Sequence, residues 1–152
     1  MSQNSGYYYY FVIVGHADNV LYETELSNQS RGGDGQTAVV ASRDDTRHLN
    51  QFIAHSALDM VDEFMWKNTS TYLKQVDKFN EWSVSAYVTA GGLRFLILYE
   101  QLKNDEALRL FFQEIYETYV KLLLNPFYVP DTQIKSVPFD KKVQAIGLRH
   151  LL

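Results

Sequence analysis

The sequence contains no cysteine among its 152 residues. The chain therefore forms no disulfide bond, offers no thiolate ligand for zinc and has no thiol nucleophile for catalysis. This composition is compatible with a reducing compartment such as the cytosol.

The chain also has no surplus of positive charge. It carries 14 Lys and Arg residues against 18 Asp and Glu residues, a formal net charge of -4. Binding to nucleic acid requires basic side chains that neutralise phosphates, so this balance argues against a nucleic-acid partner. It gives the chain as a whole no attraction to an anionic membrane, although a local basic patch is compatible with it.

Long apolar runs are missing as well. Residues 7–14 are apolar, but they are far fewer than the ~20 residues that a membrane-spanning helix needs. Residues 1–6 are polar and lack the basic and apolar regions of a signal peptide, and the C-terminus carries no apolar tail. We therefore expect a soluble, cytoplasmic protein without an integral membrane segment.

Motifs for catalysis or metal binding do not appear either. The glycine-rich residues 31–35 lack the Gly-Lys-Ser/Thr of a phosphate-binding loop, and there is no Gly-x-Ser-x-Gly motif. His48 and His55 would lie two helical turns apart, too far for one metal ion without other ligands. The acidic residues are most closely spaced at Asp44, Asp45, Asp59, Asp62 and Glu63. Roles in helix capping or on a solvated helix face explain them better than a catalytic acid–base pair does. We expect no enzymatic activity, no metal and no cofactor.

The first apolar segment, residues 7–14 (YYYYFVIV), is rich in aromatic and β-branched residues, which is typical of a strand buried on both faces. Residues 15–19 include Gly, Asp and Asn, which favour turns. Residues 20–26 alternate apolar and polar side chains, so a hairpin is predicted. Residues 27–44 are polar and glycine-rich, which predicts a flexible insertion.

A helix is expected over residues 45–66, with Asp44 or Asp45 as its N-cap. At 100° per residue, one apolar stripe is predicted to face the sheet: Leu49, Phe52, Ile53, Ala57, Met60 and Phe64. A second apolar group falls on another side of the same helix: Ala54, Leu58, Val61 and Met65.

This second apolar group needs its own cover, because one stripe is enough to pack a helix on a sheet. The insertion or the last helix could supply that cover, and so could a partner protein. Together with neighbouring carboxylates, the group gives a candidate protein interface: Leu58, Asp59, Val61, Asp62 and Met65.

Three further strands are expected at residues 71–79, 82–90 and 93–99. Asn80-Glu81 joins the first two, and Gly91-Gly92, a strong two-residue hairpin signal, joins the last two. These strands predict a meander.

Two helices are predicted near the C-terminus. The first, residues 105–124, has one apolar stripe and ends where Asn125-Pro126 stops it. Its expected core residues are Leu108, Phe111, Phe112, Ile115, Tyr119, Leu122 and Leu123. The second is short, at residues 139–148. The order β-β-α-β-β-β-α-α indicates one α+β domain, residues 1–152, with the first helix alone on one face of an antiparallel sheet.

The residues Asn125-Pro126-Phe127-Tyr128 also match the NPxY pattern that adaptor domains bind. A role as a helix stop explains them without any partner, and a sorting signal is the alternative.

Several runs of residues, in the same order along the chain, resemble the sedlin family. The runs are FVIVGH at 11–16, HLNQFIAH at 48–55, VDKFNEW at 76–82, VTAG at 88–91, NPFY at 125–128 and HLL at 150–152. The likeness covers nearly the whole chain outside residues 27–44.

The resemblance to the sedlin family implies a longin-like fold, a five-stranded antiparallel sheet with one helix on one face and two on the other. It also implies a subunit of the TRAPP tethering complex, in which other subunits promote nucleotide exchange on a Rab GTPase. The chain is then expected to be a non-catalytic adaptor or scaffold in transport between endoplasmic reticulum and Golgi. It would associate with these membranes peripherally, through the complex and its other TRAPP subunits.

Two other kinds of protein fit the same pattern of elements. A longin-like regulatory domain binds a SNARE or adaptor partner, but in a SNARE it continues into a heptad segment and a membrane anchor that this sequence lacks. A sensor-type domain that binds a small molecule would need a pocket between the sheet and a helix.

Overall fold

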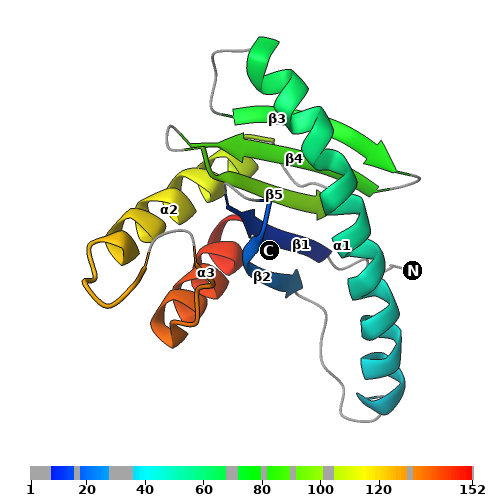
Figure 1. Cartoon of the computed structure of the whole chain (residues 1–152). Helices are drawn as coiled ribbons and strands as arrows, with labels where there is room; N and C mark the ends of the chain where they lie inside the picture. Colours follow the sequence, from blue (N-terminus) through cyan, green and yellow to red (C-terminus); the bar gives the residue numbers. More distant parts are fainter. Residues whose placement is uncertain are drawn as a thin grey trace.

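Five antiparallel strands and three helices form the described part of the chain (Figure 1). The computed structural model describes residues 8–15, 18–27, 36–67, 72–79, 82–89, 92–100, 105–129 and 132–151. The strands are β1 (Tyr8–Val14), β2 (Val20–Ser27), β3 (Tyr72–Phe79), β4 (Trp82–Val88) and β5 (Arg94–Tyr99). The helices are α1 (Gln36–Lys67), α2 (Asp105–Leu123) and α3 (Val137–His150).

The sheet has the strand order β2-β1-β5-β4-β3, and each neighbouring pair is antiparallel. β1 and β2 form the expected hairpin, β3 to β5 form the expected meander, and the pairing of β1 with β5 joins the two units. α1 lies alone on one face, and α2 and α3 lie on the other (Figure 1). The α+β, longin-like architecture is therefore confirmed. The turn expected at Asn80-Glu81 lies outside the described residues.

Aromatic rings fill the space between the sheet and the α2/α3 layer. Phe11 on β1 and Phe95 on β5 are fully buried there, because alternate residues of a strand point to the same face. Phe112 of α2 lies among rings from four other segments, with centroid distances of 5.6 Å to Tyr87, 6.0 Å to Tyr72, 6.4 Å to Phe11 and 6.5 Å to Phe95. Such ring pairs add to the stabilisation from buried area alone.

α1 packs on the opposite face through small and branched side chains. Among the α1 side chains that the structure describes, the buried ones are Ile53, Ala54, Ala57, Leu58 and Val61. They meet the alternate strand residues that point to this side, among them Val84, Ala86 and Val88. The side chains of β4 therefore alternate between the two faces, with Tyr87 on the other side of the sheet.

The expected orientation of α1 is only partly correct. Ile53 and Ala57 of the predicted stripe are buried against the sheet, and Phe64 packs against the same core. Leu49 and Phe52 were expected to face the sheet, but they are 41% and 60% exposed. Leu58 and Val61 were expected to face outward, but they are 5% and 0% exposed. In Figure 1 the first half of α1 extends past the edge of the sheet. Leu49 and Phe52 lie on the outer side of α1, whereas the adjacent Ile53 is buried against the sheet.

α1 also begins earlier than predicted, at Gln36. Residues 36–44 of the expected insertion are therefore helical, and Asp44 and Asp45 lie inside the helix instead of capping it. The sequence after Gly35 contains no Gly or Pro until α1 ends, and extending an existing helix costs little once it has formed. Residues 28–35, the rest of the expected insertion, lie outside the described residues.

The ends of α2 and α3 differ slightly from the prediction. The Ser136 hydroxyl accepts a hydrogen bond from the Phe139 backbone N–H at 3.2 Å, and this N-cap makes α3 begin at Val137. Leu123, predicted in the core, is 38% exposed because it stands in the last turn of α2. Gly147 allows α3 to lie close to β2, since a Cβ at this position would stand 2.9 Å from Leu26 Cδ1.

Glu114 connects α2 to the end of α3. Its carboxylate accepts hydrogen bonds from Arg149 Nη1 at 3.0 Å and lies 2.6 Å from His150 Nε2. Burial opposes ionisation of this carboxyl, but the hydrogen bonds with His150 and Arg149 outweigh it. The pKa of Glu114 is therefore lower than its ordinary value.

Glu114→Gln is expected to reduce stability at pH 7 only modestly, on the order of 0.5 kcal/mol, because water screens a partly exposed ion pair. A lowered pKa in the folded state stabilises the fold above the unfolded-state pKa of about 4.3, and this stabilisation is lost as the pH falls through the folded value. The gap in thermal midpoint between parent and variant should therefore close below about pH 4.3. Thermal unfolding followed by circular dichroism measures it, with Glu117→Gln as a control on the same helix. A gap that stays constant with pH would contradict this role.

Candidate protein-interaction surface

The five residues of the predicted interface do not share one exposed surface. Leu58 and Val61 are core residues against the sheet, and Met65 is half-buried against the same core. Asp59 is exposed and Asp62 is half-buried. The hypothesis of an exposed apolar strip at Leu58 and Val61 is therefore corrected, because the small residues beside them bring this side of α1 against the sheet.

Asp62 lies beside a buried arginine, Arg94, at the start of β5. Arg94 Nη2 donates hydrogen bonds to the Gly15 carbonyl oxygen at 2.8 Å and to the Asp18 carboxylate. Arg94 Nη1 lies 3.4 Å from Asp62 Oδ1. The cluster joins the first hairpin turn, β5 and α1, and the two carboxylates compensate the buried positive charge. Asp62 therefore has a structural role.

Large apolar side chains do stand on the outer side of α1, at other positions. Phe52 is 60% exposed and Trp66 is 85% exposed, and the exposed residues Asp59 and Glu63 lie between them along the helix. Phe52, Asp59 and Trp66 are seven residues apart, about two helical turns, so they follow one side of the helix over roughly 21 Å. We call these four residues the outer strip of α1: Phe52, Asp59, Glu63 and Trp66.

The outer strip combines apolar ends with an acidic middle. Exposed apolar patches with polar rims are typical of protein-binding surfaces, and their charges select and orient the partner. The outer strip is therefore complementary to a protein surface that carries both apolar and basic side chains.

A second group of exposed apolar residues lies where α2 connects to α3. Leu124 is 77% exposed and Phe127 is 91% exposed, and Val129 and Val137 are exposed as well. The end of α2 and the beginning of α3 lie at the same end of the molecule, on the opposite side of the sheet from α1 (Figure 1). We call this group the helix-end surface: Leu124, Phe127, Val129 and Val137.

A defined turn holds Phe127 in this surface. Asn125 Oδ1 accepts a hydrogen bond from the Phe127 N–H at 3.0 Å, and the Asn125 carbonyl accepts one from the Tyr128 N–H at 3.1 Å. The Tyr128 hydroxyl donates to the Thr132 carbonyl at 2.7 Å. The predicted helix stop is confirmed, since α2 ends just before this turn. Adaptor domains bind such peptides as an extended strand added to their own sheet. The residues before Asn125 are helical, so the NPFY residues do not fit this mode of binding.

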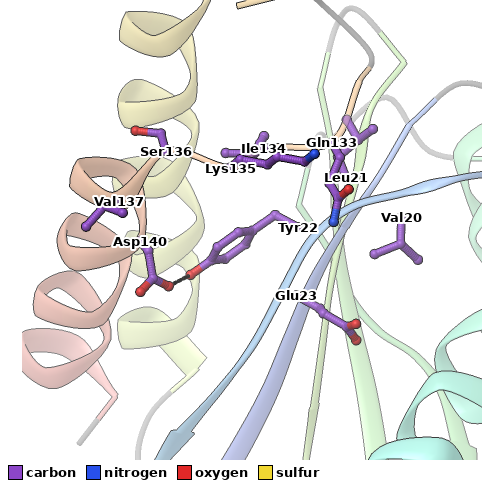
Figure 2. Close-up of a pocket in the computed structure, with 10 residues that line it drawn as sticks. All are labelled: Val20, Leu21, Tyr22, Glu23, Gln133, Ile134, Lys135, Ser136, Val137 and Asp140. Carbon is purple, nitrogen blue, oxygen red and sulfur yellow. Dashed lines mark hydrogen bonds between the residues drawn. The ribbon is translucent and has the colours of Figure 1, made fainter.

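A hollow of about 320 Å³ lies at the outer edge of β2, and Figure 2 shows the residues that line it. The Tyr22 hydroxyl donates to Asp140 Oδ1 at 2.6 Å, and the Ile134 N–H donates to the Leu21 carbonyl at 2.8 Å. Burial, together with the Asp140 carboxylate, raises the pKa of Tyr22. The hollow lies between the edge of β2 and the start of α3, and the polar groups that line it bind each other. It therefore offers little support for a small-molecule site.

Within the described ranges, no three His, Asp or Glu side chains are grouped so that they could hold a metal ion. His48 and His55 both point to solvent on α1. The helices described for this chain also include none with the length and apolar character needed to cross a bilayer.

Sequence reasoning did not identify Arg94 or the outer strip. A single basic residue at the start of an otherwise apolar strand, together with Asp18 in the turn of the first hairpin, was the available signal for Arg94. The outer strip could not be recognised while Phe52 was assigned to the core.

Comparison with known proteins gives consistent matches over most of the chain. The family model described as sedlin matches residues 13–149. A probable trafficking protein particle complex subunit 2 of Drosophila melanogaster is 47% identical over 144 residues, which cover 95% of this chain and 97% of that protein. Its counterpart in Caenorhabditis elegans is 44% identical over 143 residues, covering 94% and 96%. A transport protein particle 20 kDa subunit of Schizosaccharomyces pombe is 42% identical over 142 residues, covering 93% and 98%.

The family model spans β2 to β5, α1 and α2 in full, together with the last two residues of β1 and all of α3 except His150. The described arrangement, with one helix on one sheet face and two on the other, agrees with the longin-like fold that the sequence resemblance implied. The chain belongs to the sedlin family.

Proposed function

We propose that this chain is a non-catalytic adaptor or scaffold subunit of a trafficking protein particle (TRAPP) complex. In this role it acts in vesicle transport between endoplasmic reticulum and Golgi, in the cytoplasm and peripheral to these membranes. It supports nucleotide exchange on a Rab GTPase that other subunits carry out. The names of the relatives support the complex, and the resemblance to the sedlin family supports the transport step and the link to the GTPase.

The outer strip of α1 is the observation that carries the proposal. Exposed Phe and Trp side chains on a helix contribute nothing to the core, whereas buried in an interface they are among the residues that supply most binding energy. We propose that the outer strip docks on another subunit of the complex, with Asp59 and Glu63 facing basic groups of that subunit.

Phe52→Ala and Trp66→Ala should each weaken binding to purified complex subunits. Truncation of a residue that dominates an interface costs about 2 kcal/mol or more, roughly thirtyfold in affinity. The affinity can be measured by pull-down and by titration calorimetry with the reconstituted complex. Thermal unfolding of both variants should match the parent, because exposed substitutions change stability by only about 0.5 kcal/mol.

Leu148→Ala is the matched control for the outer strip. Leu148 is 64% exposed, close to the 60% of Phe52, but it lies on α3, across the sheet from α1. This variant should bind the complex as the parent does. If Phe52→Ala and Trp66→Ala both bind fully, the outer strip is not the docking surface.

A further inference from the structure

We propose that the helix-end surface makes direct contact with a lipid bilayer, in addition to the protein contacts of α1. Leu124 and Phe127 would enter the interfacial region of the membrane, and neighbouring lysines would bind anionic headgroups. The proposed binding partner of this surface is therefore an anionic membrane.

The exposed apolar side chains supply the first part of the argument. Phe127 and Leu124 have the highest exposed fractions among the large apolar residues on the α2/α3 side, 91% and 77%. Val129 and Val137 extend the same surface. Peripheral proteins bind membranes by inserting apolar side chains of this kind into the boundary between headgroups and acyl chains. The surface is too small for permanent insertion, so a reversible contact is expected.

Preorganisation strengthens this contact. The Phe127 backbone is held by Asn125 on one side and by the Tyr128 hydroxyl bond to Thr132 on the other. The backbone that carries the ring is therefore already ordered before it meets a membrane, and little backbone entropy is lost on insertion.

The charge distribution indicates that the membrane is anionic. Lys121 near the end of α2 and Lys141 and Lys142 near the start of α3 are all exposed. The segment from residue 120 to 142 contains four Lys against Asp131 and Asp140, a local charge of +2 (4 minus 2), whereas the whole chain carries -4.

The local charge of +2 already includes Asp140. One further acidic residue, Glu117, lies one helical turn before Lys121. Lysines close to a negative leaflet are attracted to it within a Debye length, so the local charge outweighs the net charge of the chain. The position of the surface also leaves α1 free, because α1 covers the opposite face of the sheet (Figure 1).

Vesicle flotation with the full chain tests the proposal. The probes are vesicles of phosphatidylcholine alone and vesicles of phosphatidylcholine and phosphatidylserine in equal parts. The parent chain should bind the mixed vesicles and not the neutral ones, and binding should fall as salt is added. Phe127→Ser should weaken binding by roughly tenfold or more, and the double variant Lys141→Glu/Lys142→Glu should abolish it.

Leu148→Ser and Trp66→Ser serve as matched controls. Both remove an exposed apolar side chain outside the helix-end surface, and both should float with the mixed vesicles as the parent does. The Trp66 control also separates this proposal from the docking of α1. Circular dichroism checks that every variant is folded.

Two results would overturn the proposal. The first is the absence of binding to mixed vesicles by the parent chain, and the second is parental binding by folded Phe127→Ser. If the parent does not bind vesicles and Phe127→Ser also loses affinity for purified complex subunits, the helix-end surface binds a protein.

Discussion

Phe112→Ala is expected to lower the free energy of unfolding by about 3–5 kcal/mol, because it leaves a cavity in the densest part of the aromatic core. Phe112 is fully buried and its ring lies near rings from β1, β3, β4 and β5 as well as that of Phe111. For a domain of this size the thermal midpoint should fall by roughly 6–20 °C. Differential scanning calorimetry and urea unfolding measure both quantities.

Phe127→Ala removes the same atoms from a ring that is 91% exposed, and so serves as the control. Its stability should stay within about 0.5 kcal/mol of the parent. Similar losses in the two variants would mean that the α2/α3 layer does not pack on the sheet as described.

Leu58→Ala should cost about 2–5 kcal/mol of stability, since Leu58 is buried between α1 and the sheet. Phe52→Ala, on the outer strip of the same helix, should cost almost nothing. Urea unfolding of the two variants therefore measures the orientation of α1 directly. The opposite ranking, with Phe52→Ala the more destabilising, would restore the orientation predicted from the sequence.

The strands could be predicted well because their signals are local. Alternation in β4 and the doubly apolar β1 determine which side chains face which layer, and the Asn125-Pro126 pair marks the end of α2. Once the order of strands and helices is known, the layer against which each strand face packs can be predicted as well.

The orientation of α1 could not be predicted in the same way. Its apolar residues cover a wide arc, and hydrophobicity alone does not decide which part of the arc packs on the sheet. Ala54 and Ala57 decide it in the structure, because small side chains at the contact bring Leu58 and Val61 against the strands. The start of α1 at Gln36 was missed for a related reason, since propensity predicts helix boundaries poorly where no cap is present.

The two candidate surfaces differ in how far the sequence could reveal them. The outer strip depends on which side of α1 is buried, so it follows only from tertiary structure. The NPFY residues were noticed as a pattern, but their role as a helix stop gave no indication that Phe127 would be almost fully exposed. Exposure of a turn residue depends on what the neighbouring helices leave uncovered.

The central position of β1 has a consequence for synthesis of the chain on the ribosome. β1 has apolar side chains on both faces, and its partner β5 pairs Tyr9 with Tyr99. At the usual elongation rate of about 5–20 residues per second, β1 leaves the ribosome roughly 4–17 s before β5 and still longer before α2 and α3. During that interval the nascent chain presents an unpaired, doubly apolar strand edge, the kind of segment that aggregates or recruits chaperones. A chain truncated before Arg94 would therefore lack the pairing that joins the two halves of the sheet.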